Sequence, residues 1–177
     1  GGALFLLNST IAGNSGDGIA VSCAELRLNN VTIAGNGQRG VFFDSPCGGR
    51  MEITNSLIVE NGVDCARSVG AMTPAGSASI DLDGSCSSQG FPGFTTQNPQ
   101  LLPLLGGPIF TRGIPGTSPA VDAGDPSACP TYDQRALLQD AACDVGAYEF
   151  GAASFSGNTP VGSDVVVFVV PGVRLTF

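Results

Sequence analysis

Lysine, histidine and tryptophan are absent from this chain of 177 residues, and all seven of its basic residues are arginines. Fifteen acidic residues leave a formal net charge of −8. Nucleic acids and anionic membranes are poor partners for such a chain, because their phosphate groups select basic surfaces. Without histidine, and without a CxxC pair of cysteines, the usual ligands of a zinc site are also missing. We therefore expect no nucleic acid, metal ion or cofactor as a partner.

Long hydrophobic runs are missing too. No apolar stretch reaches the roughly 20 residues that a membrane-spanning helix needs, and no basic and apolar leader opens the chain. The chain starts at Gly1 inside a repeated pattern. We therefore expect a mature or excised piece of a longer protein, with no membrane insertion by this segment.

A repeat fills the first half of the chain. The stretch NNVTIAGNG, residues 29–37, returns as NSTIAGNSG from Asn8 and as NSLIVENG from Asn55. The copies are 22 and 25 residues apart, a period typical of a solenoid, whose coils bury their apolar faces by stacking on one another. Their alignment gives two asparagine columns, the first with Asn8, Asn30 and Asn55 and the second, six positions later, with Asn14, Asn36 and Asn61.

Period-two alternation inside each copy predicts three short strands, because alternate side chains of a β-strand face opposite sides. The strand before the first column carries Leu4 and Leu6, Leu26 and Leu28, or Met51 and Ile53. The strand after it carries Ile11, Ile33 or Ile58, and the third carries Ile19 and Val21 or Val41 and Phe43. In the third copy the third strand, Val63 to Cys65, arrives about three residues early, and a weaker fourth copy shows Ile80 and Leu82. The sequence thus predicts an all-β fold, a right-handed parallel β-helix, over residues 1–86.

Both asparagine columns fit the corners of such a solenoid. Asparagine tolerates a left-handed backbone, and its amide can bond neighbouring backbone groups or the next asparagine in a ladder. The sequons that begin at Asn8 and Asn30 fall in the same register. We therefore interpret them as coil geometry before glycan attachment.

The even number of cysteines, six, favours disulfides and an extracellular or cell-surface location. Cys23 and Cys47 lie at near-equivalent points of successive coils, so a staple between coils is natural. Cys65 with Cys86, and Cys129 with Cys143, would close two local loops. The connectivity itself stays a hypothesis.

After residue 86 the periodicity fades, and residues 87–150, called the closing segment below, are rich in turns. We expect this segment to be irregular, pinned by disulfides and packed along the solenoid. Three motifs follow one another in it: SPAVDAGD (118–125), CPTYDQR (129–135) and CDVGAYEF (143–150). They are preceded by NPQLLPLLGGP, which begins at Asn98.

In this order the motifs resemble the closing part of bacterial secreted β-helix repeat proteins of the choice-of-anchor kind, and the resemblance covers most of the chain. It implies a secreted or surface protein, usually without known catalysis, that often carries further modules and a C-terminal sorting signal. The stretch DQRALLQDAAC departs from the family pattern. There the family commonly has a glycine after the arginine and another arginine soon after.

Residues 151–177 combine a linker with the stretch SDVVVFVVPGVRLTF, which predicts two strands around a Pro-Gly break, an incomplete module or an assembly element. Two strands alone are marginal in water, so they need a partner sheet. They could pack on their own β-helix, continue into a longer module, or add to another subunit. An uncapped first coil would also allow head-to-tail stacking into a filament. The predicted assembly positions are Val165, Val167, Val169, Val173, Leu175 and Phe177.

An enzyme is the competing hypothesis, because glycosidases need paired carboxylates and parallel β-helices can host catalysis. The candidate pairs are Asp81 with Asp83, Asp122 with Asp125, and Asp133 with Asp144. In the closing motifs such carboxylates more often accept backbone hydrogen bonds in turns or pair with an arginine such as Arg135. The stretch DLDGS at Asp81 has the start of a calcium loop without its later ligands.

The sequence therefore predicts a non-enzymatic, extracellular structural or adhesive protein, with filament assembly as a further expectation. The alternative is a carbohydrate-binding or carbohydrate-cleaving module. Exposed aromatic residues would favour glycan binding, but the two tyrosines, Tyr132 and Tyr148, both lie in the closing motifs. The expected partners are other copies of the chain and a cell-surface glycan.

Overall fold

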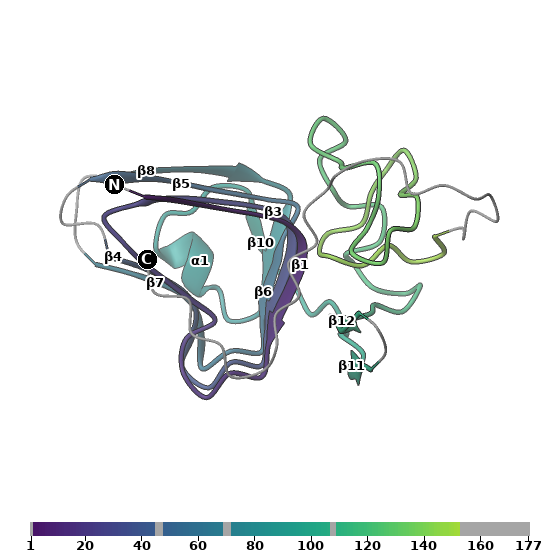
Figure 1. Ribbon diagram of the computed structural model, residues 1–177, viewed down its shortest axis with the longest axis horizontal. Coiled ribbons are helices and arrows are strands. Elements are labelled where there is room, and N and C mark those ends of the chain that lie inside the picture. Colours follow the sequence, from purple (N-terminus) through teal and green to yellow (C-terminus); the bar gives the residue numbers. More distant parts are fainter. Residues whose placement is uncertain (1, 45–47, 69–71, 107–108, 153–177) are drawn as a thin grey trace.

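The computed structural model describes residues 2–44, 48–68, 72–106 and 109–152. Four coils follow one another along its first 96 residues and stack in parallel (Figure 1). The first two coils contain β1 (Ala3–Ala12) with β2 (Ile19–Ser22), and β3 (Glu25–Ala34) with β4 (Arg39–Asp44). The third contains β5 (Gly49–Thr54), β6 (Leu57–Val59) and β7 (Val63–Arg67), and the fourth β8 (Met72–Ser77), β9 (Ser79–Asp81), α1 (Ser85–Ser88) and β10 (Phe94–Thr96).

The register follows the sequence repeat. Leu26 pairs with Leu4 on one side and with Met51 on the other, and Ile33 pairs in the same way with Ile11 and Ile58. The interior side chains of the strands form one apolar core inside the coils. The predicted all-β fold, a right-handed parallel β-helix, is therefore confirmed.

Two expectations about the coils were wrong in detail. In the third coil Val41 pairs with Cys65, so the corner is one residue shorter than in the second coil, not three. Cys65 takes the interior position, while Val63 is 41% exposed. The stack of parallel strands also continues past residue 86, because Phe94 of β10 pairs with Ser79 of β9.

A short helix closes the end of the fourth coil. In Figure 1 helix α1 lies within the outline of the coils. Cys86 of α1 is fully buried and forms a disulfide with Cys65 of β7. Phe91 and Phe94 follow and meet edge to face, with ring centroids 6.5 Å apart. These residues continue the core of the coils and cover its last layer.

The rest of the closing segment is mainly irregular and lies beside the coils (Figure 1). A hairpin in this segment pairs β11 (Leu104–Leu105) with β12 (Thr111–Arg112). A second apolar cluster joins the segment to the outer face of β3, β6 and β9. Its buried members are Ala34, Leu57, Val59, Ile80, Ile114, Ala120 and Val145. Among the residues that the structure describes, no helix is long and apolar enough to cross a membrane.

Candidate functional site at the junction of the coils and the closing segment

The first asparagine column forms a corner where the backbone turns left-handed. Asn8, Asn30 and Asn55 have φ values of 48°, 49° and 48°, and Ala78 takes the same place in the fourth coil with φ 48°. Asparagine adopts this conformation more readily than other residues with a side chain, because its short amide can bond locally. The corner explains why the sequence repeats asparagine at this point.

The amides of this column bind the closing segment and not one another. Asn8 Nδ2 donates to the Tyr132 carbonyl at 2.5 Å, and Asn30 Nδ2 donates to the carbonyls of Asp144 at 3.0 Å and Gly146 at 3.3 Å. Asn55 forms a reciprocal pair with Asp125. Its Nδ2 donates to the Asp125 carbonyl at 3.2 Å, and its Oδ1 accepts from the Asp125 N–H at 2.6 Å. Three coils are thus bonded to segments 70 or more residues further along the chain.

Two threonines beside the column add to the junction. Thr10 Oγ1 donates to Gln134 Oε1 at 2.5 Å, and Thr32 Oγ1 accepts from the Ala147 N–H at 3.0 Å. Gly146 lies against the same surface with φ 110°. A Cβ atom at Gly146 would lie 2.9 Å from both Leu57 Cδ1 and Thr32 Oγ1, so only glycine allows this close approach.

The second asparagine column forms a ladder along the coils. Asn14 Nδ2 donates to Asn36 Oδ1 at 2.9 Å, and Asn36 Nδ2 donates to Asn61 Oδ1 at 2.9 Å. The ladder ends where Asn61 Nδ2 donates to Asp64 Oδ1 at 3.1 Å. Burial raises the pKa of Asp64, and its other oxygen accepts the N–H groups of Leu82 and Asp83.

The candidate carboxylates of the fourth coil bind main-chain and hydroxyl groups. Asp81 is fully buried and accepts the Cys86 N–H at 2.9 Å and the Thr96 hydroxyl at 3.0 Å. Asp83 accepts the N–H groups of Asp64 and Ser85. Within residues 2–44, 48–68, 72–106 and 109–152, no three His, Cys, Asp or Glu side chains lie close enough together to hold a metal ion.

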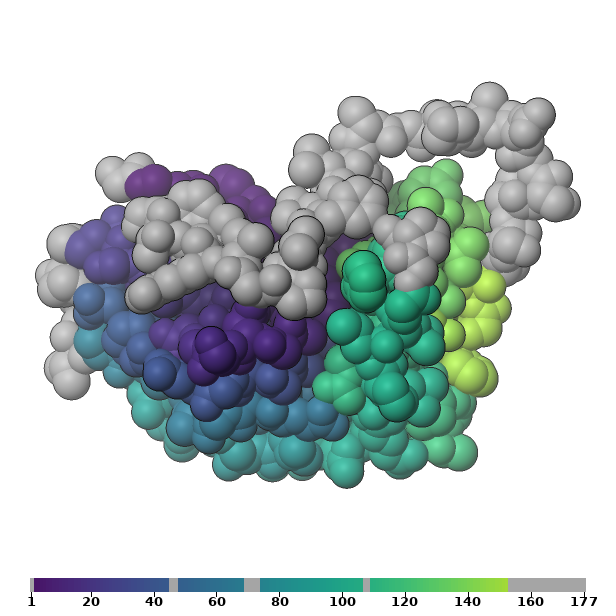
Figure 2. Space-filling view, turned by 60° about the horizontal axis from the view of Figure 1, so that its bottom comes forward, coloured from purple at the N-terminus to yellow at the C-terminus, as the bar shows by residue number. Residues whose placement is uncertain are grey.

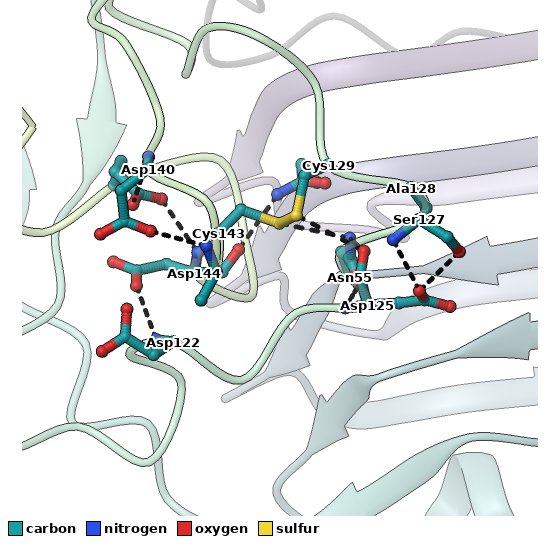
Figure 3. The surroundings of a disulfide bond; sticks show 12 residues. Asn55, Asp122, Asp125, Ser127, Ala128, Cys129, Asp140, Cys143 and Asp144 are labelled. Atoms are coloured by element: carbon teal, nitrogen blue, oxygen red, sulfur yellow. Dashed lines mark hydrogen bonds between the residues drawn. A yellow bond between two sulfur atoms is a disulfide. The ribbon is translucent and has the colours of Figure 1, made fainter.

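The carboxylates of the closing motifs also bind main-chain groups, and in this way they hold the turns of these motifs. Asp133 pairs with Arg135 Nε at 2.7 Å and accepts the Glu149 N–H at 3.2 Å. Asp144 accepts the N–H group of Asp122 at 2.9 Å (Figure 3). It also accepts the N–H group of Phe150 at 2.5 Å. The sequence suggested Asp133 and Asp144 as a candidate pair of catalytic carboxylates. In the structure each of the two carboxylates organises one of two neighbouring turns.

Glu149 is the most perturbed acid of this network. It is buried and accepts the N–H groups of Asp144 at 2.9 Å and Asp140 at 3.3 Å. Burial raises its pKa to about 7, and burial also raises the pKa of Asp144. Asp125 behaves in the opposite way, because hydrogen bonds from Ser127 and Ser77 lower its pKa. Burial and turn geometry thus account for each shift.

Two disulfides reinforce this arrangement. Cys129 is bonded to Cys143 inside the closing segment, beside Asn55 (Figure 3). Cys65 of β7 is bonded to Cys86 of α1. The proposed partner of Cys23, Cys47, lies outside the described residues, so that pairing stays a prediction. Disulfides of this kind indicate an oxidising environment.

One outward-facing strip of the coils stays open to solvent and carries both charge signs. Phe5 of β1 is 57% exposed, and the Arg27 guanidinium lies 5.3 Å from its ring centroid. Arg27 also pairs with Glu25 at 2.7 Å and lies 3.7 Å from Glu52. We call Phe5, Glu25, Arg27 and Glu52 the outer strip. The two tyrosines are not part of it, because both belong to the closing segment. The Tyr148 ring packs against the Arg135 guanidinium, and the Tyr132 carbonyl accepts a hydrogen bond from Asn8.

One protein-family model matches the sequence, and its description agrees with the fold. The model described as the right handed beta helix region matches residues 1–89, which span the four coils up to α1. No curated protein and no solved structure matches the chain. With the stacked parallel coils described above, the chain belongs to the right-handed β-helix family.

Proposed function

We propose that this chain is a non-enzymatic module of an extracellular surface protein, with a structural or adhesive role. The observation that carries the proposal is what three of the candidate carboxylates bind. Asp81, Asp133 and Asp144 are all buried and accept main-chain N–H groups. A glycosidase needs two carboxyl groups that flank a sugar in an accessible groove, so the burial of these three carboxylates supports a role in folding.

An extracellular and bacterial setting is supported by two independent features. The disulfides Cys65–Cys86 and Cys129–Cys143 support an extracellular setting, because disulfides are rare where thiols are kept reduced. The motifs of the closing segment resemble those of choice-of-anchor surface proteins, which often carry further modules beside such a β-helix. The resemblance adds secretion by a bacterium and a neighbouring anchor to the proposal.

A glycan is the adhesive target that the outer strip favours. An exposed aromatic ring can stack on the apolar face of a sugar, while neighbouring guanidinium and carboxylate groups bond its hydroxyls. Phe5 provides the ring, and Arg27 and Glu52 provide the polar groups beside it. Carbohydrate binding is therefore our second candidate function, and carbohydrate cleavage is disfavoured by the carboxylate bonds.

The experiment combines a glycan array with an assay for released reducing ends, both on the 177-residue chain. If the outer strip binds glycans, Phe5→Ala should weaken array binding at least tenfold. Phe110→Ala is the matched control, because Phe110 is 47% exposed but lies on the closing segment. Release of reducing ends that is lost in Asp122→Asn or Asp125→Asn would contradict a non-enzymatic module.

Filament assembly stays a prediction from the sequence. Head-to-tail stacking needs an open coil at both ends, and α1 closes the fourth coil. Stacking at that end would require α1 to move away from the core. We therefore propose a single module as the functional unit, and electron microscopy of the secreted protein tests this by the presence or absence of fibres.

A further inference from the structure

The second asparagine column ends with the third coil, although a fourth coil follows. The coils stack in sequence order, from the first in purple to the fourth in teal (Figure 2). Asn14, Asn36 and Asn61 supply one rung to each of the first three coils, whereas the fourth coil, residues 72–96, contains no asparagine. Counting on from the pairing of β6 with β9 puts Gly84 opposite Asn61, and α1 begins directly after Gly84. The repeat therefore stops where the chain turns inward to form α1.

A glycine column lies beside the second asparagine column. By the pairing of β2 with β4 and of β4 with β7, Gly18, Gly40 and Asp64 occupy the same place in successive coils. A Cβ atom at Gly18 would lie 2.8 Å from Asn36 Nδ2, and one at Gly40 would lie 2.6 Å from Asn61 Nδ2. Each glycine thus leaves room for the asparagine of the next coil. In the third coil no such asparagine follows, and the place of the glycine is taken by Asp64.

The Asp64 carboxylate accepts the hydrogen bonds that the next asparagine accepts in the inner rungs. Asn14 donates its main-chain N–H and its Nδ2 to Asn36 Oδ1, at 3.1 and 2.9 Å. Asn36 donates the same two groups to Asn61 Oδ1, at 3.0 and 2.9 Å. Asn61 in turn donates them to Asp64 Oδ1, at 3.2 and 3.1 Å. One carboxylate oxygen therefore stands in for the amide oxygen of a fourth rung.

The other oxygen of Asp64 binds the chain on its way into α1. Oδ2 accepts the N–H groups of Leu82 at 2.8 Å and of Asp83 at 3.3 Å. Asp83 accepts the Asp64 N–H at 3.1 Å with its Oδ2, and with its Oδ1 it accepts the N–H of Ser85, the first residue of α1, at 2.8 Å. Asp64 is 1% exposed, and a carboxylate is buried to this extent only where hydrogen bonds compensate the loss of water.

We propose that Asp64 is the residue that ends the coil repeat. A glycine at this place admits a further asparagine rung, whereas Asp64 completes the column with one oxygen and directs the chain into α1 with the other. The end of the β-helix is therefore set by a side chain of the third coil. This inference is independent of the proposed function, because an adhesive and a catalytic β-helix would both need a defined end.

The first test compares Asp64→Gly with Val63→Gly by hydrogen exchange at neutral pH, with the disulfides intact. Asp64→Gly restores the glycine of the first two coils without supplying an asparagine, so both sets of bonds to the carboxylate are lost. We expect at least tenfold faster exchange of the main-chain amides of α1 and of Asn61, Leu82 and Asp83. Val63→Gly adds a glycine to the same corner and removes a side chain that is 41% exposed, so we expect changes below threefold. Equal exchange in the two variants would overturn the proposal.

The second test separates the two oxygens of Asp64. Asp64→Asn keeps the shape of the side chain but leaves it one acceptor oxygen, because the amide nitrogen is a donor. That oxygen can bind the N–H of Asn61 or the N–H groups of Leu82 and Asp83, but not both sets. We expect at least tenfold faster exchange in one set and a change below threefold in the other. Exchange that is unchanged in both sets, or equally faster in both, would overturn the two-sided role of the carboxylate.

Discussion

Replacement of Asn30 by alanine tests the junction between the coils and the closing segment. Asn30 is fully buried, and its amide donates to the carbonyls of Asp144 and Gly146. Each carbonyl that loses its donor in a buried site costs about 1 kcal/mol. The left-handed backbone adds about 1 kcal/mol when alanine replaces asparagine. We therefore expect Asn30→Ala to lower the free energy of unfolding by about 3 kcal/mol.

The assay is urea unfolding followed by circular dichroism, with the disulfides intact. For a chain of this size, about 3 kcal/mol corresponds to a fall of roughly 6–12 °C in Tm. Hydrogen exchange locates the loss, and we expect faster exchange in the closing segment at Asp144 and Gly146 before the coils are affected. Exchange that rises first in the coils would contradict a loss of stability at the junction with the closing segment.

Ala78 supplies the matched control, because it occupies the same corner in the fourth coil with φ 48°. Ala78→Asn makes the reverse exchange and reports on the backbone preference, so we expect a gain of at most about 1 kcal/mol. If Asn30→Ala costs no more than Ala78→Asn gains, the two amide bonds contribute nothing. That result would refute the docking role of the first asparagine column.

Three further outcomes follow from the same contacts. The pKa of Glu149 is raised from its usual 4.5 to about 7, so the stability that this proton provides is present below pH 4.5 and is lost as the pH rises through 7. Glu149→Gln should flatten the fall of the urea midpoint between pH 5 and pH 8, and an unchanged slope would assign the fall to other groups. Removal of the disulfide by replacing Cys65 and Cys86 with alanine should cost about 3 kcal/mol and speed hydrogen exchange in α1. Unchanged exchange there would show that α1 keeps its place without the bond. Gly146→Ala should cost about 1–3 kcal/mol in the same urea assay, because its Cβ would clash with the coils. Gly16→Ala, where a Cβ meets nothing within 4 Å, should be near neutral, and equal losses at both sites would contradict the close approach at Gly146.

The strands could be predicted because their signal is repeated and local. A parallel β-helix buries every second side chain of each strand, so Leu26 and Met51 occupy the same interior position in successive coils and are both apolar. Alternation cannot decide whether Val63 or Cys65 is the equivalent of Val41 in the third coil, since both residues suit an interior site. The mistake about the third corner has this cause.

The junction could not be predicted, because its partners are far apart in the sequence. The repeat indicates that Asn30 tolerates a left-handed corner, but nothing local indicates that Asp144, 114 residues later, lies opposite its amide. Helix α1 is a different case. Its four residues, SCSS, are too few to show helical periodicity, and its position depends on the disulfide to Cys65 and on the end of the core.

Hydrogen exchange of the unmodified chain tests most directly whether the closing segment is an integral part of this β-helix. The amides to follow are those of Asp125, Val145 and Gly146, which bond Asn55 Oδ1, the Ala120 carbonyl and the Asn55 carbonyl. We predict that they exchange as slowly as the core amides of β3, because the segment and the coils unfold together. Exchange a hundredfold faster than in β3 would mean that the segment opens independently, and the docking role assigned to the first asparagine column would be contradicted.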